Sequence, residues 1–433
     1  MSQDLKTFAE ERGVKFFLFN FTDLFGHQRA KLVPASAAAD MQASGAGFAG
    51  FAAWLDMTPA HPDMFVMPDP ESAIQLPWKP EIAWVAGNPW MDGKPVEQAP
   101  RNVLKRLIEE AAAKDMTLMT GVEPEFHLIN ADGTDISDPR DIQEKPCYDQ
   151  SALMRRVDVI AEICETMEGM GWGPYQNDHE DANGQFEINW DYTPALVTAD
   201  RLAFFKFMVK EIAAKHGLRA TFMPKPFGHL TGNGCHVHTS LWSGDGTTCL
   251  FAGDDEMGLS PECYTFIGGL MEHAEALCAL TNPTVNSYKR INAPVTQSGA
   301  TWSPSSVTYG GNNRTHMIRI PDAGRIEFRL ADGAANPYLL MGGLLAAGLD
   351  GMAKKTDPGP RLDIDMYAEA EKAGEVKKLP LNMLDAIRAF DGSPLADAMG
   401  AEFAQAYVNL RLKEWNDFTR HLTTWERDHT LDC

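Results

Sequence analysis

The chain has 433 residues, which is too long for one small hydrophobic core and predicts two domains, or one large domain with an appendage. Hydrophobic residues make up 44% and charged residues 23% of the chain, as in ordinary globular proteins. The formal net charge of −22 argues against nucleic acid and anionic membranes as partners.

Neither a secretory leader nor a membrane span is visible in the sequence. No basic segment followed by an apolar one begins the chain, and no run of about 18 apolar residues occurs in it. The seven cysteines are scattered and lack C-x-x-C pairing. We therefore expect reduced thiols, no zinc site and a cytoplasmic protein.

Residues 1–98 predict a small β-rich domain. A short helix is expected over residues 4–12, followed by an aromatic strand from Lys15 that turns at Phe25–Gly26 and a second strand that ends at Pro34. Residues 45–53 are small, and we expect them to be flexible. Further short strands, punctuated by Pro and Gly, are expected between residues 63 and 87.

After Pro100 the pattern becomes helical. Apolar residues at helical spacing predict helices over residues 100–115, 150–169, 199–216 and 261–281, a buried helix rich in small residues over 331–355, and a largely helical segment from 381 to about 431. Polar loops are expected over residues 131–145 and 176–185, and an irregular stretch over 293–313.

Four apolar-flanked segments between these helices carry polar residues at every second position. They are GVEPEFHL with Glu123 and Glu125, GQFEINW with Glu187 and Asn189, CHVHTSLW with His236, His238 and Ser240, and GRIEFRL with Arg325, Glu327 and Arg329. Since alternate side chains of a strand share a face, we predict a curved sheet with a charged concave face. A sheet facing solvent also alternates, but it rarely mixes Glu, His and Arg in this way.

The residue types indicate phosphoryl transfer. Five carboxylates and one imidazole, counting Glu180 beside the second strand, suit hard cations such as Mg²⁺ or Mn²⁺. Five arginines in an otherwise acidic chain can neutralise carboxylate and phosphate groups: Arg290, Arg314, Arg319, Arg325 and Arg329. Carboxylates, metal and arginine together are the composition of phosphoryl-transfer sites, although the chain contains no P-loop motif.

Six motifs follow one another along the chain: EPEF, HEDANGQFEI, GNGCHVHTSLW, NSYKR, NNRTHMIRIP and GRIEFRLADGAANPYL. In this order the chain resembles the glutamine synthetase superfamily over nearly its whole length. The resemblance implies an α+β fold, with a β-grasp N-terminal domain over residues 1–98 and a catalytic domain over residues 99–433 built on a curved antiparallel sheet flanked by helices. It also implies a dodecamer of two hexameric rings, with active sites shared between neighbouring subunits.

The same resemblance implies a role for each motif residue. Two Mg²⁺ or Mn²⁺ ions would be held, one by Glu125, Glu180 and Glu187 and the other by Glu123, His236 and Glu327. Arg314 and Arg319 would stabilise the transferred phosphate, and Arg290, Arg329 and the Gly232 backbone would bind glutamate. ATP, the co-substrate, would lie near His238, Ser240, Arg319 and Arg325.

Three departures from the family pattern bear on the second substrate and on regulation. Ammonia-using relatives carry F-D-G-S-S where this chain has Phe48–Ala52, so the Asp position is Ala49 and the last Ser position is Ala52. The relatives' flap glutamate is also absent, and Asn292 lies near its position. No adenylylation motif occurs around residues 377–380, so we expect no regulation by that route.

An amine must lose a proton before it attacks an acyl phosphate, so another base is required. Asp178, two residues before Glu180, is the candidate, with Tyr148 nearby to bind the amine and Glu187 to assist the second deprotonation. The alternative for Asp178 is an ordinary loop carboxylate, in solvent or in a turn.

These features favour a glutamate–methylamine ligase that acts through γ-glutamyl phosphate. An apolar wall at Ala49 and Ala52 would accommodate a methyl group, and the segments QNDHEDANGQFEINW and SGATWSP resemble the branch of γ-glutamylmethylamide synthetases and type III-like glutamine synthetases. The alternatives are a glutamine synthetase that uses ammonia, a ligase for a larger amine, a metal-dependent hydrolase and a catalytically silent structural homologue.

Overall fold

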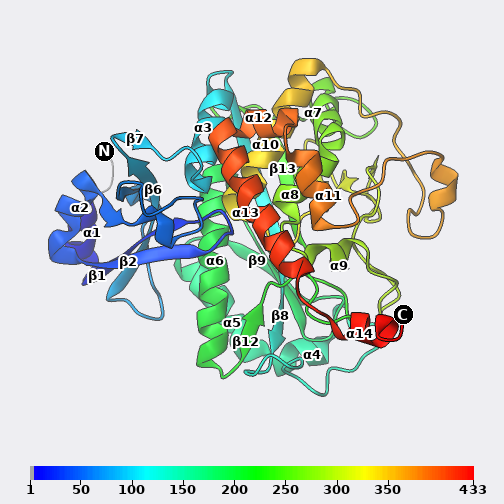
Figure 1. Cartoon of the computed structure of the whole chain (residues 1–433), viewed down its shortest axis with the longest axis horizontal. Coiled ribbons are helices and arrows are strands. Elements are labelled where there is room, and N and C mark those ends of the chain that lie inside the picture. Colours follow the sequence, from blue (N-terminus) through cyan, green and yellow to red (C-terminus); the bar gives the residue numbers. More distant parts are fainter. Residues whose placement is uncertain (1–3) are drawn as a thin grey trace.

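The computed structural model describes residues 4–433, so the first three residues of the predicted domain 1–98 lie outside it. It contains a seven-stranded sheet, ordered β2-β1-β6-β4-β3 with β5 and β7 on β6, and a nine-stranded sheet, ordered β14-β15-β16-β13-β8-β10-β9 with β11 and β12 on β8. Helices surround the second sheet, and the first lies at one end of the long axis (Figure 1). The predicted α+β fold class is confirmed.

The smaller sheet is built from short strands around an aromatic one. Its elements are α1 (Leu5–Arg12), β1 (Phe16–Thr22), β2 (Gln28–Pro34), α2 (Ala38–Ser44), β3 (Ala46–Phe48), β4 (Met64–Pro68), β5 (Ile74–Gln75), β6 (Ile82–Met91) and β7 (Lys94–Pro95). Helix α1 begins where the Asp4 carboxylate accepts a hydrogen bond from Lys6 N, and it ends at Gly13 with φ +69°. The segment expected to be flexible, residues 45–53, contains β3 and a 3₁₀ turn over Gly50–Ala52.

The larger sheet is centred on β8, which is 14 residues long. Its strands are β8 (Met116–Ile129), β9 (Pro174–His179), β10 (Gln185–Trp190), β11 (Thr193–Pro194), β12 (Arg219–Thr221), β13 (Cys235–Ser243), β14 (Tyr309–Gly310), β15 (Ile318–Arg319) and β16 (Ile326–Phe328). All pairings are antiparallel except β14 with β15. This is the curved sheet that the alternation of polar residues predicted.

Twelve further helices cover this sheet and fill the C-terminal part of the described chain. They are α3 (Pro100–Ala112), α4 (Gln150–Arg155), α5 (Val157–Gly169), α6 (Ala195–Lys215), α7 (Pro261–Glu272), α8 (Ala274–Thr281), α9 (Ser287–Ile291), α10 (Pro337–Lys354), α11 (Met383–Phe390), α12 (Pro394–Met399), α13 (Ala401–Thr419) and α14 (Thr424–Thr430). None of the helices within residues 4–433 combines the length and apolar character needed to cross a bilayer.

Three predicted elements differ in the structure. The helix expected over residues 150–169 is interrupted at Arg156, whose guanidinium donates to Ser137 Oγ at 2.9 Å. The helix expected over residues 261–281 is interrupted at His273, whose ring contacts Asp350 at 2.6 Å. The loop expected from residue 176 is instead the end of strand β9, because it pairs with β10.

One hydrophobic core joins the two sheets. It runs from Phe21, Leu55 and Trp84 on the side of the smaller sheet to Phe204 and Phe205 on α6, and the Trp84 and Phe204 rings lie 5.6 Å apart. The boundary at residues 98/99 therefore coincides with a change of sheet but not with a break in the core. The division into two domains stays a prediction.

Arg101 lies buried at the junction between the two sheets. Its guanidinium donates to Asp200 on α6 at 2.7 and 2.9 Å, to Asp69 at 2.8 Å and to Asn88 Oδ1 at 2.6 Å. Tyr338 on α10 donates to the same Asp200 at 2.7 Å. The bonds of Arg101 and Asp200 thus connect the smaller sheet with α3, α6 and α10.

We expect Arg101→Met to destabilise the protein by about 3–5 kcal/mol, because it leaves a buried carboxylate without its cation. Arg106→Met on the same helix is the control, since Arg106 pairs with Glu110 at the surface and should contribute less than about 1 kcal/mol. Chemical denaturation of both variants measures the difference. Equal stability of the two would contradict a structural role for the Arg101 network.

Candidate active site

The strand register brings the predicted acidic residues to one face of the larger sheet. β8 and β13 pair with His236 opposite Glu123, and β8 and β10 pair with Glu187 opposite Glu125. β16 adds Glu327 by pairing with β13. Directly opposed residues of an antiparallel pair point to the same side, so these side chains converge. Together with Glu180 they form what we call the acidic cluster.

The ligand atoms of the acidic cluster, together with those of Asp178, fall into three groups, each within 4.8 Å. The groups are Glu123, His236 and Glu327; Glu125, Glu187 and His236; and Asp178, Glu180 and Glu187. The first is the predicted second metal set. The predicted set Glu125, Glu180 and Glu187 is divided between the other two groups, which share Glu187.

Electrostatics in the acidic cluster favour a bound cation. Burial, and then the neighbouring carboxylates Glu123 and Glu125 respectively, raise the pKa of Glu187 and of Glu180 well above the ordinary range. Nε2 of His236 is buried and has no hydrogen-bond partner within residues 4–433. Carboxylate oxygens around one imidazole suit Mg²⁺ or Mn²⁺, so the residues present fit two divalent ions.

Arginines contact the acidic cluster at Glu327. Both oxygens of Glu327 accept from guanidinium groups, one from Arg319 at 2.6 Å and the other from Arg329. Arg290 is buried on α9 and donates to the Leu330 carbonyl at 3.0 Å. Arg314 is exposed in the turn before β15, and within residues 4–433 no hydrogen bond or ion pair joins it to the acidic cluster.

A cavity of about 340 Å³ opens beside Glu123. Three of the four residues assigned to the nucleotide line it, namely His238, Ser240 and Arg325, whereas Arg319 lies against Glu327 instead. His238 Nε2 is 2.8 Å from Glu123, and Trp242 Nε1 donates to Ser240 Oγ at 2.9 Å. The sequence analysis did not identify the aromatic residues of this wall: Tyr175, Trp190, Tyr192 and Trp242.

Gly232 lies where no side chain fits, because a Cβ there would collide with the Pro224 carbonyl and approach Arg290. Its own carbonyl accepts from Gln185 Nε2 at 3.1 Å. The same amide donates to Glu125 at 2.9 Å, and Gly234 N adds a second bond to that carboxylate at 2.7 Å. Gln185 therefore orients Glu125, a role that its motif alone did not reveal.

Asp178 lies on β9 directly opposite Glu187, so it is neither a loop nor a turn residue. Burial, followed by repulsion from Glu125 and Glu123, raises the pKa of its carboxyl to about 6. Its Oδ1 is buried without a hydrogen-bond partner among the described residues. Tyr148 lies beside the end of β9, since its backbone N–H donates to the His179 carbonyl at 2.8 Å. Its side chain is 70% exposed.

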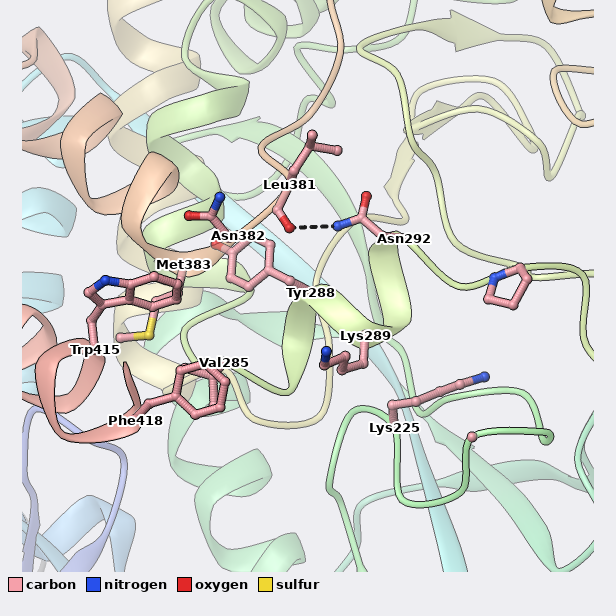
Figure 2. A pocket seen from close by; sticks show the side chains of 12 residues that line it. Lys225, Val285, Tyr288, Lys289, Asn292, Leu381, Asn382, Met383, Trp415 and Phe418 are labelled. Atoms are coloured by element: carbon pink, nitrogen blue, oxygen red, sulfur yellow. Dashed lines mark hydrogen bonds between the residues drawn. The ribbon is translucent and has the colours of Figure 1, made fainter. Parts of the chain in front are cut away.

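Asn292, which the motifs place near the position of the missing flap glutamate, faces a separate cavity of about 550 Å³ (Figure 2). Its amide donates to the Leu381 carbonyl at 2.9 Å on the wall of that cavity. The loop that follows Asn292 is held instead by Asp181, whose carboxylate accepts from Ser298 and, at 2.7 Å, from Thr231. A hydroxyl-to-carboxylate contact therefore joins this loop to the turn that carries Glu180.

Comparisons with known proteins agree on one family. The glutamine synthetase catalytic domain matches residues 97–430. The chain is 63% identical to a glutamine synthetase of Rhizobium leguminosarum bv. phaseoli, over 100% of both chains, and 40% identical to a glutamate–methylamine ligase of Methyloversatilis universalis, over 99% of both. It is also similar to a solved structure of a GmaS/ADP complex, with 64% identity, a TM-score of 0.96 and 100% of both chains covered.

Proposed function

The chain belongs to the glutamine synthetase family, as its motifs predicted, and we propose that this ATP-dependent ligase joins glutamate to methylamine. The γ-carboxylate of glutamate attacks the γ-phosphorus of ATP, so that γ-glutamyl phosphate forms and ADP leaves. The amine nitrogen then attacks the acyl carbon. A C–N bond forms, inorganic phosphate leaves, and the surplus proton passes to a base.

The residues of the candidate site would have different roles in this reaction. Two divalent ions would neutralise the carboxylates and the phosphate oxygens. One would be held by Glu123, His236 and Glu327, whose ligand atoms lie within 4.8 Å of one another, and the other by the motif residues Glu125, Glu180 and Glu187. Arg314 and Arg319 would offset charge on the transferred phosphoryl group. Arg290, Arg329 and the Gly232 backbone would orient glutamate, and His238, Ser240 and Arg325 would bind the nucleotide.

The observation that carries the choice of amine is the uncharged stretch Phe48–Ala52. Ala49 and Ala52 stand where ammonia-using relatives place an Asp and a Ser, and Phe51 beside them is 49% exposed. In a dodecamer of two hexameric rings this stretch would line a neighbouring subunit's site. A wall of methyl and phenyl groups favours a methylated amine over ammonia by about 1–3 kcal/mol.

Ammonia remains the second candidate, because the 63% identical relative is named a glutamine synthetase. A ligase that discriminates by a single methyl group also keeps some activity with the smaller amine. The two functions therefore differ in the ratio of kcat/KM values and not in the presence of either activity.

We expect kcat/KM for methylamine to exceed that for ammonia by about 10–100-fold, measured as phosphate release with saturating ATP and glutamate. Ethylamine, tested alongside, reports whether the pocket is wider than a methyl group. Ala49→Asp should reverse the preference, since the carboxylate replaces the apolar surface that contacts the methyl group and accepts hydrogen bonds from ammonium. A higher kcat/KM for ammonia in the unmodified protein would make it a glutamine synthetase.

A further inference from the structure

His179 lies between two side chains of the candidate site but points away from it. Along β9, Asp178 faces the acidic cluster opposite Glu187, and His179 turns to the other side opposite Phe186. The His179 ring is fully buried and lies 5.3 Å from the Phe186 ring, nearly perpendicular to it. Because Asp178 precedes it and Glu180 follows it, the placement of His179 sets the direction of both carboxylates.

Asp141 holds this histidine from the polar loop after β8, a segment to which the motifs assign no role. Oδ2 of Asp141 is 2.6 Å from His179 Nε2 and accepts from Gly184 N at 2.7 Å. Oδ1 accepts from Asn183 Nδ2 at 2.9 Å. Asp141 is itself only 3% exposed. One buried carboxylate thus binds both ends of the turn over residues 179–184.

The turn has little room for another arrangement. Gly184 has φ +73°, and a Cβ at that position would lie 3.0 Å from Ile136. His179 Nδ1 is 3.0 Å from the Glu180 carbonyl, and Glu180 N donates to the Gln185 carbonyl at 2.9 Å. The side chain of Glu180 is therefore carried on a backbone fixed from three directions.

We propose that Asp141 is a positioning residue that aims Glu180 and Asp178 into the site through its contacts with His179 and Gly184. Asp141 touches no substrate. Its expected effect on the KM for the amine rests on the proposed function, whereas its expected effect on metal affinity does not. Loss of the Asp141 carboxylate should loosen the group Asp178, Glu180 and Glu187 and leave the group Glu123, His236 and Glu327 unchanged. Outer partners of ligand residues typically contribute about 10–100-fold to metal affinity.

The test compares Asp141→Asn with Asp350→Asn in the full-length protein. Asp350 and His273 form a second pair with the same 2.6 Å contact, on α10 and at the start of α8, outside the candidate site; His273 is buried and Asp350 is half-buried. Titration of metal-free protein with Mn²⁺, followed by electron paramagnetic resonance, measures the two ions separately. We expect Asp141→Asn to lower the affinity for one Mn²⁺ ion about 10–100-fold and that for the other less than about twofold. Asp350→Asn should leave both affinities unchanged.

Kinetics supply the second measurement. Asp141→Asn should raise the KM for the amine while the affinity for ADP stays within about twofold. Should Asp141→Asn not fold, Asn183→Ala removes one of the three contacts of Asp141. This variant must still lower the affinity for the same ion about threefold.

The proposal is overturned if Asp141→Asn binds both Mn²⁺ ions as tightly as the unmodified protein does and only its thermal stability falls, as in Asp350→Asn. Asp141 would then be a structural residue only. If the metal effect appears but ammonia proves the better substrate, the positioning role stands and the choice of amine fails. The two proposals are therefore separable.

Discussion

Glu187→Gln is expected to lower turnover about a thousandfold or more and yet to stabilise the metal-free protein. Glu187 belongs to two of the three ligand groups and is 7% exposed. Glutamine has the same shape but no charge, so it removes a buried carboxylate that Glu123 and Glu180 repel. The same change removes a ligand that both groups use, so metal binding and catalysis suffer together.

Thermal unfolding with and without Mn²⁺ separates the two effects. In the unmodified protein, an ion at 100 times its dissociation constant adds about 2.7 kcal/mol to the free energy of unfolding. In Glu187→Gln we expect a higher melting temperature without metal and loss of the part of the metal-induced increase that comes from the ion held by Glu125, Glu180 and Glu187. The control is Glu272→Gln, in a cluster with His273 and Asp350 where Lys354 already provides the cation.

Unchanged metal-induced stabilisation in Glu187→Gln would contradict the assignment of this residue to the ion held by Glu125, Glu180 and Glu187. A lower melting temperature in the absence of metal would mean that repulsion is not what dominates the acidic cluster. Activity alone could not distinguish these outcomes, because a misplaced substrate also lowers turnover.

The alternation of polar residues was sufficient to predict the charged face of the larger sheet. Period two is a local property of strands such as β8 and β13, so it can be read without knowing their neighbours. The partition of ligands could not be predicted in this way. Whether Glu180 groups with Glu125 or with Asp178 depends on side-chain distances across β9 and β10.

The interruptions of the helices and the contacts of the loop could not be predicted from local sequence patterns, for a related reason. Apolar spacing continues across Arg156 and His273, so the sequence predicted continuous helices. The breaks coincide with side-chain contacts to the distant residues Ser137 and Asp350. Asp141 was likewise interpreted as part of a polar loop, since only the folded turn brings it to His179.

Asp178→Ala is expected to slow amide formation from methylamine about 10²–10⁴-fold, the usual contribution of a general base. Methylammonium is a cation at neutral pH and must give up a proton before its nitrogen can attack. The Asp178 carboxylate is placed for this step, because it faces Glu187 across β9 and β10 and its Oδ1 has no protein partner within residues 4–433. Affinity for ADP should stay unchanged, since the cavity proposed for the nucleotide does not include Asp178.

Hydroxylamine distinguishes a base from a group that merely orients the acyl phosphate. It is already uncharged at neutral pH, so γ-glutamyl hydroxamate can form without a protein base, and Asp178→Ala should retain most of this activity. Asn177→Ala is the matched control, because Asn177 is the preceding residue on β9 and its exposed side chain points to the other face. Equal losses with methylamine and hydroxylamine would remove Asp178 from proton transfer and assign it to the acyl-phosphate step. Glu187, the next carboxylate across the sheet, would then become the base to test.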